Sequence, residues 1–215
     1  MIEHVIFDLD GTLADSAPGI TACLAHAIRV LGAAPPSFGE LRAFIGTPLE
    51  EIFAAVVPGA CDDDVASAVD AYRVEYRRSG AARSPLFPGI PEALDALRER
   101  GHRLAVATAK RHDEAATVVR GLGLAGRFDA VVGSDRARGV RSKTDVLRAC
   151  VEELGARPAR IAMVGDRHHD VRAARELGAF SIGVAWGYGA RAELDGAHAI
   201  ANAPRDLLDL VARAA

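Results

Sequence analysis

Close to its start the chain reads Val5-Ile6-Phe7-Asp8-Leu9-Asp10-Gly11-Thr12, so two carboxylates and a glycine follow directly on a short apolar run. Such a run is typical of a buried strand, and side chains two residues apart on an extended chain point to the same side. Asp8 and Asp10 are therefore expected to face one ligand. Carboxylates this close repel each other unless a cation bridges them, and oxygen donors favour a hard ion such as Mg²⁺. Gly11 allows the backbone to turn sharply and approach a phosphate.

Similar apolar runs recur along the chain and indicate further strands. They are nearly continuous rather than alternating, which is typical of strands covered on both faces of a parallel sheet. Helical patterns lie between them and end at glycines. We therefore predict an α/β fold with a doubly wound, Rossmann-like parallel sheet, in which ligands gather at the carboxyl ends of the strands. The four further runs are Leu104–Ala107, Ala130–Val132, Ile161–Val164 and Ile182–Val184.

One long interval interrupts this alternation. After Asp8 no strand pattern appears until about Arg103, and residues 15–84 have helical apolar spacing. A Pro/Gly-containing stretch at 85–89 then resembles a linker. We predict a small all-α domain at 15–84 inserted into a catalytic core formed by 1–14 and 85–215. The alternative is that these helices belong to the core layer, although one crossover rarely needs more than one helix.

Polar residues follow three of the other predicted strands. Thr108 and Lys110 end the second, Lys143 opens the helix before the fourth, and Asp166 and Asp170 follow the fourth. Each also has an ordinary structural explanation: a hydrogen-bonded strand end, a solvated helix start or a helix cap. Their shared position at the carboxyl edge of one sheet favours a common site that binds an anion.

Composition limits the class of protein. The 215 residues are 50% hydrophobic and 26% charged, as in a globular chain, and the net charge of −3 does not suggest a nucleic-acid surface. The three cysteines are far apart, which argues against a disulfide framework. No signal peptide or membrane span is evident, so a cytoplasmic protein with no membrane partner is expected. Only two lysines occur, Lys110 and Lys143, against 24 arginines, which makes both lysines conspicuous.

The chain resembles the haloacid dehalogenase superfamily of aspartate-nucleophile phosphatases, and looks most like its phosphoglycolate phosphatase branch. The likeness rests on Phe7–Leu13, on Phe87-Pro88-Gly89 leading to Thr108, on Lys143, and on Gly165-Asp166 with Asp170. The helical insert is similar to that family's small cap. Two positions depart from the family pattern: Thr144 follows the lysine where a proline is usual, and Ala109 replaces a frequent polar residue.

The resemblance implies a role for each residue at the predicted site. Asp8 would attack phosphorus to form an aspartyl-phosphate, and Asp10 would act as general acid and then base. Mg²⁺ would be held by the Asp8 carboxylate, the Asp10 backbone carbonyl and Asp166. Thr108 and Lys143 would bind phosphate oxygens, and Asp170 would orient Lys143 or a metal-bound water. The substrate contacts expected beyond these are Gly11, Arg42, Gly46, Thr47, Ala109 and Lys110.

The expected function is Mg²⁺-dependent hydrolysis of a small cytosolic phosphate monoester such as phosphoglycolate, a nucleotide or a sugar phosphate. A sugar-phosphate mutase of the β-phosphoglucomutase kind would use the same residues. A non-enzymatic phospho-aspartate regulatory domain is a third possibility. Dehalogenase chemistry is disfavoured because it does not need the general acid and base that Asp10 supplies. Phosphonatase chemistry is disfavoured because it uses a lysine of the cap to form a Schiff base, and residues 15–84 contain no lysine.

Three other features of the sequence support weaker interpretations. Gly121–Gly126 matches a dinucleotide fingerprint but follows a helix pattern and precedes a strand, the reverse of the required order. His168-His169 lacks a third nitrogen or sulfur ligand for zinc. Three arginines precede Lys143. They are either ordinary exposed residues or residues that bind a second anionic group of the substrate: Arg136, Arg138 and Arg141.

Overall fold

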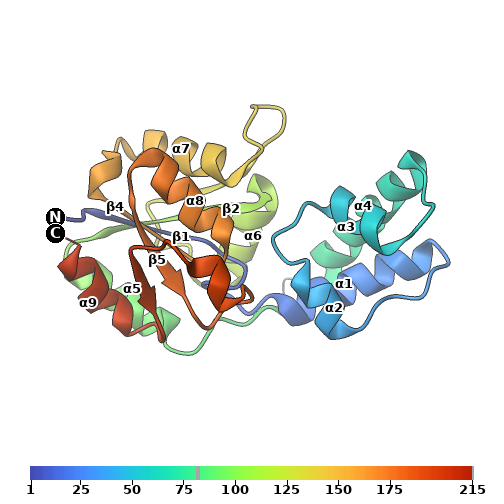
Figure 1. The fold of residues 1–215 in the computed structure, drawn as a ribbon, viewed down its shortest axis with the longest axis horizontal. Helices are drawn as coiled ribbons and strands as arrows, with labels where there is room; N and C mark the ends of the chain where they lie inside the picture. Colours follow the sequence, from blue (N-terminus) through green and yellow to red (C-terminus); the bar gives the residue numbers. More distant parts are fainter. Residues whose placement is uncertain (81–82, 215) are drawn as a thin grey trace. The chain divides into compact units, whose positions relative to one another are not determined.

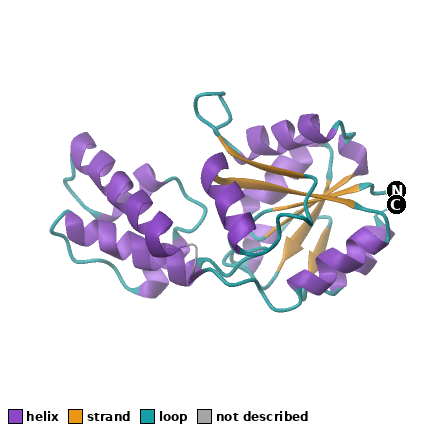
Figure 2. Ribbon diagram, turned by 180° about the vertical axis from the view of Figure 1, so that it is seen from behind, coloured by secondary structure: helices purple, strands orange, loops and turns teal. Residues whose placement is uncertain are grey.

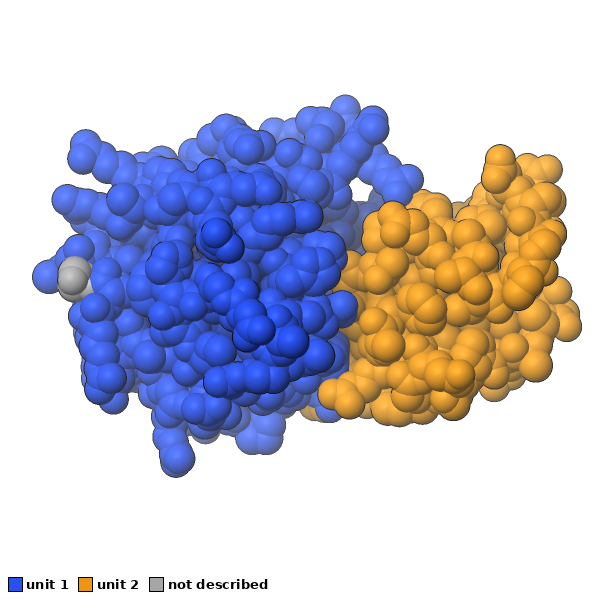
Figure 3. All heavy atoms as spheres, in the orientation of Figure 1, with its two compact units in different colours: residues 1–15, 86–215 blue, residues 16–85 orange. Residues whose placement is uncertain are grey.

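The structure is a computed structural model that describes residues 1–80 and 83–214 (Figure 1). The chain forms two compact units. Unit 1 comprises Met1–Asp15 and Leu86–Ala215, and unit 2 comprises Ser16–Pro85 (Figure 3). The division predicted from the sequence placed the two boundaries one residue earlier.

Unit 1 is built on a six-stranded sheet in the order β3-β2-β1-β4-β5-β6, with every neighbouring pair parallel. The fold class predicted from the sequence is therefore confirmed. Because β1 lies between β2 and β4, the loops after these three strands open on the same edge of the sheet. The strands are β1 (His4–Phe7), β2 (Arg103–Arg111), β3 (Ala130–Ser134), β4 (Ile161–Gly165), β5 (Phe180–Val184) and β6 (Ala199–Ala201).

Helices cover the sheet of unit 1 (Figure 2). α7 and α8 pack against each other, α7 also against β2 and β3, and α8 against β4 and β5. Side chains such as Ile6, Leu147 and Met163 form the buried core beneath these two helices. Elsewhere on the sheet, α5 contacts α9 and α6 contacts β2 and β3. These helices are α5 (Ile90–Glu99), α6 (His112–Gly121), α7 (Lys143–Leu154), α8 (His168–Leu177) and α9 (Asp206–Arg213), and two short 3₁₀ turns span Pro158–Arg160 and Arg191–Leu194.

The sequence patterns located five of the six strands. β4 is buried at every position, which explains its unbroken apolar run. β6 was missed because the strand has only three residues, Ala199–Ala201, and lies at an edge of the sheet. Two of the three residues are only partly buried, so the strand leaves no apolar pattern. Two glycines predicted as helix ends, Gly155 and Gly178, adopt the left-handed conformation directly after α7 and α8.

The regular structure of unit 2 is helical throughout residues 16–80 and 83–85, as expected for the insert. α1 buries Ile20, Leu24 and Ile28 along one face and packs against α4. A short π-helical turn, Tyr76–Gly80, follows α4, and a Cβ on Gly19 would lie 2.3 Å from the Gly80 carbonyl oxygen, so glycine permits this close approach to α1. The helices are α1 (Ala17–Val30), α2 (Phe38–Ala43), α3 (Leu49–Val56) and α4 (Asp62–Glu75). Across the residues described in both units, no helix has the length and apolar character needed to cross a membrane.

Candidate active site

Four charged side chains meet at the carboxyl edge of the central strands. The Lys143 ammonium lies 2.7 Å from Asp8 Oδ1 and 2.8 Å from Asp170 Oδ1. Asp166 joins them, since carboxylate oxygens of Asp8, Asp166 and Asp170 lie within 4.8 Å of one another. All four side chains are largely buried. The tertiary structure therefore brings together, from three separate loops, the residues that the sequence placed at three strand ends.

The loop after β1 owes its shape to Gly11. This residue has φ +87°, and a Cβ there would lie 2.4 Å from Asp166 Oδ2, so both the turn and the close packing require glycine. The amides of Leu13 and Ala14 donate to the Leu9 carbonyl and close the turn. Asp8 is held at the strand end because its own amide donates to the Val164 carbonyl at 2.9 Å.

Helix caps place Lys143 and Asp170. Ser142 caps α7: its hydroxyl accepts from the Asp145 amide at 3.1 Å, and its amide donates to Asp145 Oδ2 at 2.9 Å. This capping box makes Lys143 the first residue of α7. Asp170 Oδ2 accepts from the Arg167 amide at 3.1 Å, which leaves its other oxygen on Lys143. Asp170 thus both caps α8 and pairs with the lysine.

The site carries more negative than positive charge. Burial raises the pKa of Asp8 to about 6; Lys143 opposes this shift and Asp170 adds to it. Burial and the repulsion of Asp170 and Asp8 likewise raise the pKa of Asp166 to about 7. Burial also works against the ammonium of Lys143, but Asp170 and Asp8 outweigh that effect and raise its pKa. One lysine therefore stays charged beside three carboxylates that are costly to ionise together.

This arrangement fits a hard divalent cation. The donors are all carboxylate oxygens, which such ions prefer, and a cation would offset the excess negative charge. The expected metal set contained Asp8, Asp166 and the backbone carbonyl of Asp10. The structure adds the Asp170 carboxylate to the side chains that face the centre.

A second ion pair lies at the end of β2. Lys110 Nζ is 3.0 Å from Asp10 Oδ2, and both side chains are mostly buried. The Lys110 amide donates to the Thr108 hydroxyl at 3.3 Å, and Thr108 itself is buried. Asp10, Thr108 and Lys110 are therefore joined in one group. Ala109, between them in the sequence, is exposed.

The segment after β5 forms a wall of the site that the sequence prediction missed. The Tyr188 amide donates to Asp166 Oδ2 at 2.7 Å, and the Trp186 indole donates to the Thr12 carbonyl at 3.0 Å. A Cβ on Gly187 would lie 2.2 Å from the Asp166 Cβ. The fifth strand also ends at the carboxyl edge, so the strand-end rule applied to Ala185–Gly189 would have found this segment.

The other residues singled out in the sequence belong to other parts of the chain. Arg42, Gly46 and Thr47 belong to unit 2, where Arg42 and Gly46 are exposed. The arginines at 136, 138 and 141 are exposed on the loop before α7. His168 Nδ1 lies 2.8 Å from Glu193 Oε2, so its partner is a carboxylate. Gly121 is the last residue of α6, which confirms that Gly121–Gly126 is a helix end.

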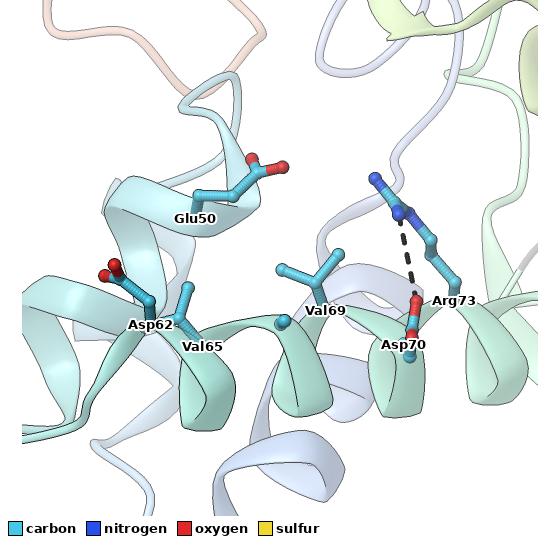
Figure 4. Close-up of a pocket in the computed structure, with 7 residues that line it drawn as sticks. Glu50, Asp62, Val65, Val69, Asp70 and Arg73 are labelled. Atoms are coloured by element: carbon cyan, nitrogen blue, oxygen red, sulfur yellow. Dashed lines mark ion pairs between the residues drawn. The ribbon is translucent and has the colours of Figure 1, made fainter.

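Unit 2 contains a separate hollow of about 360 Å³ between α3 and α4 (Figure 4). The side chain of Arg73 points into it, and Arg73 Nη1 lies 3.9 Å from Asp70 Oδ1. The full lining is Glu50, Asp62, Val65, Ala66, Val69, Asp70 and Arg73.

Comparison with known proteins identifies the family. Residues 5–184 match the haloacid dehalogenase-like hydrolase family, a span that includes every member of the cluster. The chain belongs to this family. A solved structure of a haloacid dehalogenase-like family hydrolase from Streptococcus pneumoniae superposes with a TM-score of 0.90 at 31% identity and covers 97% of this chain and 98% of that chain. A predicted phosphatase from Clostridium acetobutylicum superposes with a TM-score of 0.91 at 32% identity and covers 99% of each chain. The haloacid dehalogenase-like fold therefore extends over both units.

Curated relatives of this haloacid dehalogenase-like chain have different activities in their names. The tyrosine-protein kinase PtkA of Mycobacterium tuberculosis is 41% identical over 189 residues, which is 87% of this chain. The chain spans only 63% of that relative's length. A 5′-nucleotidase of Pseudomonas aeruginosa is 36% identical over 191 residues, or 89% of this chain and 86% of the relative.

Proposed function

We propose that the protein is a Mg²⁺-dependent phosphomonoester hydrolase that acts on a small metabolite through an aspartyl-phosphate on Asp8. The observation that carries this proposal is the contact of 2.7 Å between Lys143 Nζ and Asp8 Oδ1 inside the aspartate cluster. An ammonium held beside a carboxylate of raised pKa favours its ionised, nucleophilic form. Membership of a hydrolase family and the similarity to a 5′-nucleotidase support the same reaction class.

The reaction would proceed in two displacements at phosphorus. In the first, an Asp8 oxygen forms a bond to phosphorus while the bond to the ester oxygen breaks, and Asp10 gives that oxygen a proton. In the second, Asp10 takes a proton from water, whose oxygen attacks phosphorus and releases Asp8 and inorganic phosphate. The Lys143 ammonium and the Thr108 hydroxyl would hold phosphate oxygens, and Asp170 would keep Lys143 in place.

Mg²⁺ would be held by Asp8 and Asp166, with the Asp10 backbone carbonyl as the third protein ligand. When bound, it would neutralise charge on the phosphoryl group. Unit 2 would serve as a cap whose Arg42, Gly46 and Thr47 contact the part of the substrate that is not transferred. We propose a phosphorylated metabolite of the cytoplasm as substrate: phosphoglycolate, a nucleoside monophosphate or a sugar phosphate.

Turnover of p-nitrophenyl phosphate with and without Mg²⁺ tests the reaction, and a panel of metabolite phosphates tests the substrate. Asp8→Asn should lower kcat at least about 10³-fold without changing the melting temperature by more than a few degrees. Asp113→Asn, at an exposed residue of α6, is the matched control. A wild-type protein that hydrolyses no phosphate ester would refute the proposal, as would an Asp8→Asn variant with substantial turnover.

Two other phosphoryl transfers share this chemistry. A sugar-phosphate mutase would return the phosphoryl group from Asp8 to a second hydroxyl of the sugar, and an isomerisation assay with sugar phosphates distinguishes it. The similarity to PtkA favours a further candidate, transfer from a nucleoside triphosphate to a tyrosine hydroxyl. Incubation with ATP and a tyrosine-containing peptide, followed by mass spectrometry for phosphotyrosine, tests that candidate. Hydrolysis of monoesters without peptide phosphorylation would support the phosphatase.

A further inference from the structure

Both lysines of the chain lie beside aspartates of the motif after β1. Lys143 pairs with Asp8, and Lys110 pairs with Asp10. Elsewhere the chain uses arginine for positive charge, 24 times in all. A lysine ammonium is a compact charge on a flexible stem, which suits a narrow space beside a single carboxylate better than the broad arginine fork. The side chain of Lys110 is only 6% exposed and that of Asp10 14%, so this pair is not a surface ion pair.

The backbone around Lys110 is shaped to direct its side chain. The register of β2 against β3 shifts between Thr108 and Arg111. Thr108 pairs with Gly133 and Arg111 pairs with Ser134, so two extra residues of β2 lie between these pairs. The extra residues form a bulge, and bulges beside active sites commonly redirect a side chain. The Ser134 hydroxyl fixes the bulge by donating to the Ala109 carbonyl at 2.9 Å. A Cβ at Gly133 would lie 2.5 Å from the Lys110 carbonyl oxygen, so glycine is required opposite the bulge.

We propose that Lys110 is a positioning residue, which acts on the reaction through Asp10 and not through the substrate. This inference rests on the proposed function, in which Asp10 moves the protons of both displacements. The Asp10 side chain projects from a turn and has two rotatable bonds. An ammonium 3.0 Å away, itself anchored by the bulge, restricts the orientations of the carboxylate. In this proposal Lys110 acts one contact further from the substrate than the direct contact expected from the sequence.

This role predicts which kinetic constants change. With an alkyl phosphate, removal of Lys110 should lower kcat, because it disorders the group that transfers protons in both displacements, and should leave KM nearly unchanged. The first displacement should suffer more with an alkyl phosphate than with p-nitrophenyl phosphate, because an alkoxide needs a proton to leave and p-nitrophenolate does not. The second displacement is the same for every substrate. With p-nitrophenyl phosphate the variant should therefore show a rapid burst of product followed by slow turnover, and KM for this substrate should fall together with kcat.

A double-mutant cycle between Lys110 and Asp10 tests the inference. Lys110→Met should lower kcat about tenfold or more for glycerol phosphate while KM changes less than about twofold. In an Asp10→Asn background the same substitution should change the rate less than about twofold, because the side chain that Lys110 positions can no longer transfer a proton. Arg111→Met, which removes the adjacent exposed positive charge, is the control and should leave kcat unchanged. Effects of Lys110 and Asp10 that multiply, or a rise in KM alone, would show direct contact with substrate and overturn the inference.

A structural readout separates this inference from the proposed function. Crystal structures of the wild type and of Lys110→Met should show one Asp10 side-chain orientation in the first and a displaced or disordered one in the second. An Asp10 carboxylate that keeps its position without Lys110 overturns the positioning role, whatever the activity. Absence of phosphatase activity in the wild type would instead refute the proposed function, and the Asp10 orientation would still decide whether Lys110 positions it.

Discussion

The backbone amide of Tyr188 donates a hydrogen bond of 2.7 Å to Asp166 Oδ2. A residue that follows β5 thus orients a carboxylate that follows β4. The same loop also reaches the turn after β1, because the Trp186 indole donates to the Thr12 carbonyl and the Tyr188 hydroxyl donates to Asp15 Oδ1 at 2.9 Å. The cluster of Asp8, Asp166 and Asp170 is therefore supported by hydrogen bonds from the segment Ala185–Ala190, which has no charged side chain.

Substitution of Gly187 should damage the site without touching a charged residue. A Cβ there would lie 2.2 Å from the Asp166 Cβ and 2.6 Å from the Gly11 carbonyl oxygen, so Gly187→Ala must displace one of them. We expect a loss of about 1–3 kcal/mol in the free energy of unfolding, measured by urea denaturation, together with a fall in kcat. Gly121→Ala is the control: it has open space around it at the end of α6 and should be neutral or stabilising. Equal stability of both variants would contradict the packing argument.

Loss of Lys143 should cost both stability and activity. Lys143→Met leaves Asp8 and Asp170 buried without their ammonium, and breaking a buried ion pair in this way typically costs about 3–5 kcal/mol. Chemical denaturation of the metal-free protein measures this loss. Lys143→Arg should have as little turnover as Lys143→Met, because a planar guanidinium cannot replace a compact ammonium between two carboxylates. A Lys143→Arg variant with wild-type kcat would show that charge alone is sufficient.

Glu193 should make the protein sensitive to acid. Its partial burial acts against ionisation, but hydrogen bonds from His168 and Arg167 hold the pKa of Glu193 at about 2. A carboxyl whose folded pKa lies below its unfolded value of 4.5 stabilises the fold above pH 4.5, and this contribution is lost as the pH falls toward 2. The stability difference between wild type and Glu193→Gln should therefore shrink as the pH is lowered from 6 to 3. Glu152→Gln, on the exposed face of α7, controls for the lost carboxylate, and a difference that grows on acidification would contradict the assignment.

The three cysteines should differ sharply in reactivity. Cys23 and Cys150 are buried, and burial raises the pKa of the Cys150 thiol to about 12, whereas Cys61 is exposed at the start of α4. A thiol must ionise to react, so a disulfide reagent such as 5,5′-dithiobis(2-nitrobenzoate) should modify one thiol in the native protein and three in denaturant. Cys61→Ser should abolish the native reaction. A second fast thiol in the native state would contradict the burial of Cys23 and Cys150.

The sequence alone was sufficient for the fold class and for the strand-end positions of the clustered residues. Apolar runs report burial on both faces of a parallel sheet, and in such a sheet the carboxyl ends of neighbouring strands must share an edge. That reasoning located Asp8, Lys143 and Asp166 without coordinates. It could not reach β6, whose Ala199–Ala201 run is too short and too weakly buried to leave a pattern.

The resemblance left two partners open for Asp170, Lys143 or a metal-bound water, and only the tertiary structure decided which side chains pair. The contact of Asp170 with Lys143, that of Lys110 with Asp10, and the support of Asp166 by Tyr188 join residues between 22 and 100 positions apart. Such pairings depend on strand order, on the bulge in β2 and on glycines that let loops approach within contact distance. Local sequence determines whether a segment is a strand or a helix, because backbone sterics and burial act over a few residues. The geometry between loops is set by how the whole sheet packs, and no short motif encodes it.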